Sequence, residues 1–183
     1  MHGIVHKTLK SYVIEKADEA AWETILERAA VEPKLYLPVS HYPDAEVAGI
    51  LQTLSALSGH APETIERDFG RALAPALLST FSAHLTGCDD LVAVLDSLEG
   101  VSADLADHDD LSPPRLTCSF DGGGSGSDGD VAVVTYDSER DHCAMAHGIL
   151  EGIVAEYGAD ATVAKTGCVR DGETACTFRV GLN

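Results

Sequence analysis

Two consecutive prolines, Pro113 and Pro114, divide this chain into two stretches with different residue patterns. Proline has no amide hydrogen and cannot continue a helix. Before the pair, apolar residues recur at helical spacing in several segments between residues 5 and 105, interrupted by a proline-containing loop at residues 31–43, and the helix predicted over residues 69–85 is expected to end at Gly87. After the pair, β-rich segments at residues 115–120, 131–136, 162–165 and 174–182 surround a helical segment at residues 142–157. The pattern predicts one α+β domain, mainly helical over residues 1–111 and sheet-containing over residues 112–183.

The length and composition are those of a folded domain. The chain has 183 residues, of which 45% are hydrophobic, and this is enough to bury a sizeable core. No segment approaches the roughly 18 consecutive apolar residues of a transmembrane helix. Residues 1–13 lack the apolar block and the small-residue cleavage site of a signal peptide. We therefore expect a cytoplasmic protein.

The net charge of -18, from 12 basic and 30 acidic residues, excludes two classes of partner. Nucleic acid would be repelled at every phosphate, and an anionic membrane surface would be repelled in the same way. The acidity has two interpretations: an acidic face that binds a partner, or a solvated surface suited to a high-salt cytoplasm. Because the acidic residues are spread along the whole chain, we favour a halophilic acidic protein.

The segment from Tyr136 through Ser138 to Arg140 has the pattern Tyr-x-Ser-x-Arg. This pattern resembles the signature of the heme–nitric oxide/oxygen binding (H-NOX) family, a heme domain found alone in bacteria and at the start of soluble guanylate cyclase subunits. Further similarities follow in the family's order: Met1-His2-Gly3, Trp22, Phe69-Gly70, Pro114 and the segment from Gly148 to Gly152. The resemblance therefore spans nearly the whole chain.

The resemblance implies a fold and a function. The fold is a helical N-terminal part followed by an antiparallel sheet with a packed signature helix. The function is nitric oxide sensing and signal transduction through heme b, with no enzymatic activity. The chain contains no kinase or cyclase segment, so by family analogy it would act on a separate signalling protein of the kinase or cyclase type and bind a diatomic gas.

The chemistry of the signature suits a heme cofactor, which carries two propionate carboxylates. Arg140 can hold a carboxylate through two parallel charged hydrogen bonds, and Tyr136 and Ser138 offer hydroxyl donors. A spacing of two along an extended segment places all three side chains on one face. The alternative is a strand end at which Arg140 pairs with one of the many acidic residues.

The chain departs from the family where the iron-binding histidine is expected, 13 residues before the proline. That position is Val101, and a slip of two residues reaches Glu99. Valine cannot ligate iron, whereas a neutral imidazole is the usual proximal ligand of a sensor heme. The nearest histidine, His108, lies about 10 Å further along a helix and is flanked by aspartates. It is either a substitute ligand or a surface residue, so heme binding is conditional.

A second departure concerns the choice of gas. Oxygen-binding members of the family place a distal tyrosine five residues after the signature arginine, and here that position is Met145. A thioether cannot donate a hydrogen bond to dioxygen. If heme is bound, we expect the pocket to favour nitric oxide over oxygen. Met145 is equally compatible with simple core packing.

Five cysteines cannot form a complete set of disulfides within one chain, and cytoplasmic thiols usually stay reduced. Cys168 and Cys176 flank a predicted hairpin turn, and Cys143 begins the helix expected beside it. Some bacterial H-NOX members look similar here, and these bind a structural, redox-sensitive zinc. Cys88 and Cys118 have no comparable partners, and we interpret them as core thiols.

Zinc requires four sulfur or imidazole ligands in a tetrahedron. In those relatives the fourth is a histidine three residues before the late cysteine pair, and here that position is Lys165. His147 lies four residues after Cys143, on the same helix face, and is the predicted replacement, with His142 as the alternative. The competing interpretation is three inert buried thiols.

Three functions compete at this point. The first is a heme-based gas sensor with unusual or absent iron ligation. The second is a heme-free module of the same fold that senses thiol redox state through zinc. The third is an enzyme in which His147 activates Cys143 as a nucleophile, and it ranks last because no orienting group or oxyanion donor can be named.

Overall fold

The N-terminal half is helical, as the apolar spacing predicts. The structure, a computed structural model, describes residues 1–106, 114–121 and 131–182. Its first five helices are α1 (Gly3–Lys16), α2 (Glu19–Arg28), α3 (Asp44–Ser58), α4 (Pro62–Thr80) and α5 (Leu91–Ala106). Local chemistry sets several of the ends. The carboxylate of Asp18 accepts a hydrogen bond from the Ala21 amide at 2.7 Å, and Gly59 ends α3 with a left-handed φ of 72°.

The α4 helix ends earlier than the sequence predicts. We expected it to continue to residue 85, but it stops at Thr80 and the chain goes on in turns to Gly87. The turns carry hydrogen bonds between residues three apart, such as His84 N to Phe81 O at 2.9 Å. The hydroxyl of Thr80 bonds back to the Ala76 carbonyl, and serine and threonine are weak helix formers.

The C-terminal half contains the predicted sheet. Its elements are β1 (Arg115–Asp121), β2 (Val131–Asp137), α6 (Cys143–Glu156), β3 (Ala161–Gly167), the short 3-10 helix η1 (Val169–Asp171) and β4 (Cys176–Leu182). The strand order is β1-β2-β4-β3, and every neighbouring pair is antiparallel. The predicted α+β fold is therefore confirmed. The expected boundary at residue 111 falls outside the described residues.

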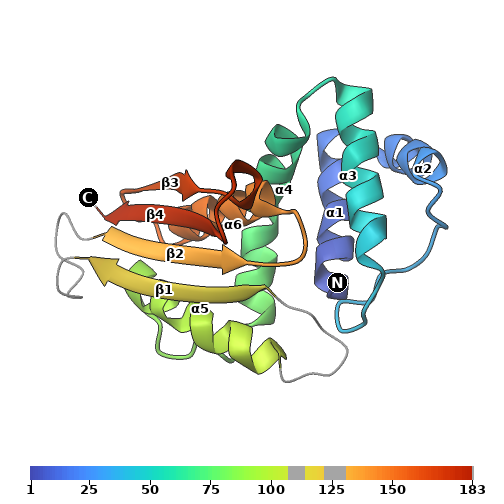
Figure 1. The fold of residues 1–183 in the computed structure, drawn as a ribbon. Helices are drawn as coiled ribbons and strands as arrows, with labels where there is room; N and C mark the ends of the chain where they lie inside the picture. The colour runs from blue at the N-terminus through green and yellow to red at the C-terminus, as the bar shows by residue number, and fades with distance from the viewer. Residues whose placement is uncertain (107–113, 122–130, 183) are drawn as a thin grey trace.

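The helix α4 stands between two hydrophobic clusters. In Figure 1, α1, α2 and α3 lie together on one side of α4, and the sheet lies on the other side with α5 and α6. One cluster joins α1 to α4 around Leu9, Ile50 and Phe69, while the other joins α5 and α6 to the sheet around Leu95 and Phe178. Among the described residues, no helix is long and apolar enough to cross a membrane.

The helices α4 and α6 touch backbone to backbone, and this requires glycine. A Cβ atom added to Gly70 would lie 2.2 Å from the Met145 carbonyl oxygen, and one added to Gly148 would lie 2.0 Å from that of Arg67. Any larger residue would separate the two helices. The contact places Met145, which lies in the first turn of α6, against the core of the first cluster.

Candidate functional site

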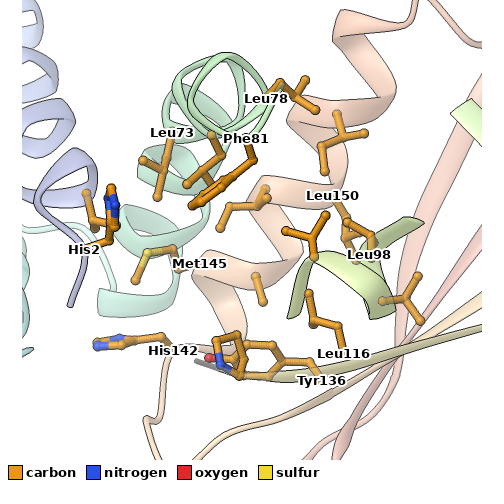
Figure 2. Close-up of a pocket in the computed structure, with 18 of the residues that line it drawn as sticks. His2, Leu73, Leu78, Phe81, Leu98, Leu116, Tyr136, His142, Met145 and Leu150 are labelled. Carbon is orange, nitrogen blue, oxygen red and sulfur yellow. The ribbon is translucent and has the colours of Figure 1, made fainter. Parts of the chain in front are cut away.

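A cavity of about 260 Å³ lies between the two clusters, walled by side chains from α1, α4, α5, α6 and the sheet. Most of the walls are apolar: Leu73 and Phe81 face it from the α4 side, Leu98 from α5, Leu116 from β1 and Leu150 from α6 (Figure 2). Polar side chains line it at four described positions, which are His2, Tyr136, Arg140 and His142. A predominantly apolar cavity with a few polar groups is typical of a small-molecule or cofactor site.

The signature residues lie at one end of this cavity. Tyr136 and Arg140 line it, and the Ser138 hydroxyl accepts a hydrogen bond from the Arg140 amide at 3.1 Å. Burial raises the pKa of Tyr136, which keeps its hydroxyl protonated as a donor. Of the three signature side chains, Ser138 does not line the cavity. It instead shapes the turn at residues 138–141, called the signature turn below, which carries Arg140.

Arg140 forms an ion pair with an acidic residue, as the alternative interpretation of the signature predicts. Its Nε donates to Oδ2 of Asp44, at the start of α3. The N-terminal ammonium lies 2.5 Å from the other oxygen of the same carboxylate. Burial tends to raise the pKa of Asp44, but hydrogen bonds from the ammonium and from Arg140 outweigh it and lower the pKa.

The cavity is also lined by two histidines, His2 and His142, that the sequence analysis did not assign to it. Nδ1 of His142 lies 3.3 Å from Oε1 of Glu66, and both side chains are about 12% exposed. His2 caps α1, and its Nδ1 accepts a hydrogen bond from the Ile4 amide at 3.4 Å. Burial, followed by the nearby His41 and the N-terminal ammonium, lowers the pKa of His2, so its ring is neutral at pH 7. Two sequence signals could have pointed to His2: its position just before the first helix and its place in the Met1-His2-Gly3 opening.

Among the α5 residues whose side chains the structure describes, those that line the cavity offer no metal ligand. Val94, Leu98 and Val101 line it, and Glu99 is exposed on the outside of the helix. His108, which the sequence left as either a substitute ligand or a surface residue, lies outside the described residues. Pro114 and Met145, both predicted to belong to the site, line the cavity, and Met145 is only 5% exposed.

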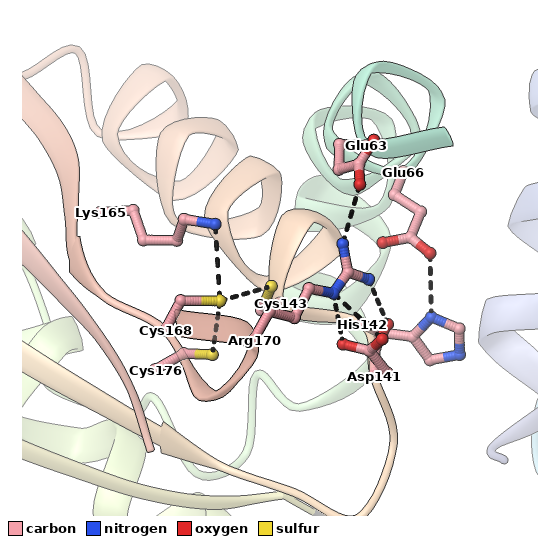
Figure 3. Close-up of polar contacts among 9 residues, drawn as sticks. All are labelled: Glu63, Glu66, Asp141, His142, Cys143, Lys165, Cys168, Arg170 and Cys176. Atoms are coloured by element: carbon pink, nitrogen blue, oxygen red, sulfur yellow. Dashed lines mark hydrogen bonds and ion pairs between the residues drawn. The ribbon is translucent and has the colours of Figure 1, made fainter. Parts of the chain in front are cut away.

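A second site lies close to the C-terminal end of the signature turn, where three cysteines meet (Figure 3). Cys143 begins α6, Cys168 precedes η1 and Cys176 begins β4, and each is 1% exposed. Sγ of Cys168 lies 3.6 Å from Sγ of Cys143 and 3.7 Å from Sγ of Cys176. All three sulfur atoms lie within 4.8 Å of one another, so the group could hold a metal ion. Cys88 and Cys118 are half-buried and lie outside this group.

His147 does not join the three cysteines, contrary to our expectation. Its Nε2 lies 3.2 Å from the carbonyl oxygen of Val163 in β3, and its ring packs against Phe178 with centroids 5.5 Å apart. The spacing of four residues does place His147 on the same helix face as Cys143, but β3 holds the imidazole away from the sulfur atoms. It therefore cannot serve as the base for Cys143 in this arrangement either.

Lys165 lies beside the cysteines, at the position where the family resemblance implies a histidine ligand. Its Nζ lies 3.7 Å from Sγ of Cys168 (Figure 3). Burial tends to raise the pKa of Cys168, but the Arg170 amide, the two neighbouring thiols and the Lys165 ammonium lower it. Burial raises the pKa of Cys143 to about 12. Burial also raises the pKa of Cys176. Cys168 is therefore the thiol of the group that ionises most readily.

The signature turn connects the cavity with the cysteines. Nε of Arg170, next to Cys168, donates to both carboxylate oxygens of Asp141 at 2.8 and 3.0 Å. The same guanidinium lies 2.9 Å from Glu63 in α4. Because Asp141 precedes the cavity residue His142 and the cluster residue Cys143, one short segment contributes to both sites.

Comparisons with known proteins agree with the geometry. A family model described as Haem-NO-binding matches residues 2–165. An H-NOX protein from S. oneidensis in the Fe(II)NO ligation state has a TM-score of 0.88 and 19% identity, covering 100% of this chain and 99% of its own. A mutant H-NOX of T. tengcongensis has a TM-score of 0.83 and 21% identity, covering 100% and 98%. No curated protein matches the sequence significantly. Because the family match extends over most of its length, this chain belongs to the Haem-NO-binding, or H-NOX, family.

Proposed function

We propose that this chain is a sensor domain whose cavity binds heme b. The heme would bind nitric oxide, and the domain would then signal to a separate protein of the kinase or cyclase type. The observation that carries the proposal is the apolar cavity with Tyr136 and Arg140 at one end, in a chain of this family. Bound heme would supply an iron that takes up a diatomic gas. The side chains of the protein would bind and orient the cofactor.

The lining of the cavity fits the organic part of heme. Its apolar walls suit a porphyrin ring, and the Arg140 guanidinium and the Tyr136 hydroxyl suit carboxylates. To hold a propionate, Arg140 would leave Asp44, which keeps the N-terminal ammonium as a partner. The cavity of about 260 Å³ lies just below the roughly 300–1,000 Å³ of most ligand pockets, so we expect it to widen on binding.

The lining fits the iron less well. The α5 helix presents Val101 where the family resemblance implies a histidine, and a valine side chain has no donor atom. The described histidines that line the cavity are His2 and His142, on the walls formed by α1 and by the start of α6. We therefore propose that heme is held loosely. Met145 offers no hydrogen-bond donor, and this supports nitric oxide rather than oxygen as the ligand.

Titration of the purified protein with hemin, followed through the Soret band, tests this function. Arg140→Ala should weaken heme binding about tenfold, because a propionate loses its charged donor. Arg28→Ala, on the exposed side of α2, is the matched control and should leave the affinity unchanged. Equal affinities in the wild type and Arg140→Ala would remove Arg140 from the site, and no binding at all would end the heme proposal.

A second function is supported by the three cysteines. We propose a heme-free module of the same fold, in which a metal ion on Cys143, Cys168 and Cys176 responds to thiol oxidation. Zinc is the ion that the family resemblance implies. Structural metal sites of this type can contribute roughly 10 kcal/mol or more to folding. Metal analysis of the reduced protein tests the site, and release of the ion by hydrogen peroxide tests the redox response.

A further inference from the structure

We propose that the three cysteines bind copper(I), as a three-coordinate thiolate complex, and that they bind zinc poorly. The inference rests on the second proposed function only for the existence of a metal site. It names the ion and its coordination, and it departs from the zinc that the family resemblance implies.

The number of ligands decides between the two ions. Structural zinc almost always takes four protein ligands in a tetrahedron. Within the described residues, the cluster consists of three sulfur atoms and contains no histidine or carboxylate. The imidazole of His147 is engaged with the Val163 carbonyl, and that of His142 with Glu66. Copper(I) is a soft ion with a filled d shell, and three thiolates complete its coordination.

The spacing of the sulfur atoms suits a metal ion. Ligands about 2.3 Å from a shared metal lie roughly 3.8–4.0 Å apart, depending on whether there are three or four of them. The two printed separations from Cys168, of 3.6 and 3.7 Å, are close to this range. The thiols therefore need little movement to bind an ion, although the spacing alone does not select copper(I) over zinc.

Lys165 and burial together leave no fourth ligand. The Lys165 ammonium lies 3.7 Å from Cys168, and when protonated it has no lone pair to offer a metal. Water is the usual fourth ligand of zinc sites with three protein ligands, but the three cysteines are each only 1% exposed. The ammonium also compensates charge, because three thiolates around a monovalent ion carry two excess negative charges.

Anaerobic titration of the reduced, metal-free full chain tests the inference, with copper(I) and zinc each set against a chromophoric competitor. We expect one copper(I) per chain, a thiolate-to-copper charge-transfer band, and three sulfur neighbours in X-ray absorption. Cys168→Ser should abolish the three-sulfur complex. Cys118→Ser is the matched control, because this thiol lies outside the cluster.

The sharpest variant is Lys165→His, which supplies the missing imidazole. It should raise zinc affinity on the order of tenfold or more and leave copper(I) affinity within a factor of about two. Lys165→Gln, which removes the charge without adding a ligand of comparable strength, should not raise zinc affinity to that extent.

Two results would overturn the inference. Tight four-coordinate zinc binding by the wild type, unaffected by Lys165→His, would contradict it while leaving the metal-based redox function in place. Failure of both ions to bind would end both proposals.

Discussion

The cavity and the cysteine cluster differ in how each accommodates a missing histidine. In the cavity, Val101 stands where the family resemblance implies the iron ligand, and the neighbouring α5 residues that face the cavity are apolar too. In the cluster, Lys165 stands where the resemblance implies a zinc ligand, yet three sulfur atoms remain within 4.8 Å. In the cavity an apolar side chain therefore stands where the resemblance implies a ligand, whereas in the cluster an ammonium stands there beside three sulfur atoms that could still hold a metal ion.

The difference follows from how each site gains its binding energy. A heme cavity gains most from burial of the apolar ring and from its carboxylate contacts, so it can persist without an iron ligand. A metal–thiolate site gains almost everything from the ligands themselves. Losing one ligand in the first case weakens binding of the same cofactor. Losing one in the second case changes which ion fits.

The largest effect should come from restoring the iron ligand. Val101→His would place an imidazole on the α5 wall of the cavity. We expect heme affinity to rise on the order of 100-fold, since even partners outside the coordination sphere change metal affinity 10–100-fold. The Soret band should also shift to that of an imidazole-ligated iron. Val101→Ala is the control and should show neither change; an equal response from both variants would mean that added space, not ligation, limits binding.

A smaller effect is expected at the ion pair that joins α4 to α6 through Glu151. Nε of Arg67 and Nε of Arg71 each lie 2.9 Å from Oε2 of Glu151, whose side chain is 20% exposed. Glu151→Gln should lower the free energy of unfolding by about 1.5–3 kcal/mol at pH 7, the range for hydrogen bonds to charged groups. Chemical denaturation would measure it. Glu156→Gln, at the exposed end of α6, should change stability little.

The same pair gives a pH dependence with a definite sign. Burial tends to raise the pKa of Glu151, but the hydrogen bond and charge of Arg67 outweigh it and lower the pKa. A lowered folded-state pKa adds stability above the unfolded value, near 4.3, and this stability is lost as the pH falls through the folded value. The difference between wild type and Glu151→Gln should therefore be constant near neutrality and disappear in acid. A difference that grows below pH 4 would contradict the assigned pair.

The smallest and most general effect concerns salt. With a net charge of -18, the protein repels itself at low ionic strength, and salt screens this repulsion. The melting temperature should rise by several degrees between dilute buffer and molar potassium chloride. Because screening acts on the whole surface, the rise should be similar in the wild type and in Val101→His. A melting temperature that does not rise would remove the halophilic interpretation.

The sequence predicted the arrangement of elements well because periodicity and proline act locally. The strands around Val134 and Phe178 and the meeting of Cys143, Cys168 and Cys176 followed from patterns along the chain. The failures at the two sites involve contacts between distant segments. Helical spacing placed His147 on the correct face, but its bond to Val163 depends on how β3 packs.

Local sequence patterns also could not predict other contacts around the cavity. The partner of Arg140 is Asp44, 96 residues away, and an acidic chain offers many equivalent candidates. His2 lines the cavity from the start of α1, which is held to the loop before α3 by a hydrogen bond from the Gly3 amide to the Ser40 carbonyl at 2.7 Å. No periodicity in the sequence encodes such a contact.

The contrast between the two sites is tested most directly by metal and heme analysis of the same freshly purified, reduced protein. After expression with copper, zinc and a heme precursor supplied, elemental analysis would be compared with the Soret absorbance. The account predicts about one thiolate-bound metal ion per chain and heme that is substoichiometric and lost on gel filtration. Stoichiometric heme that survives gel filtration, in a protein without metal on its cysteines, would contradict it.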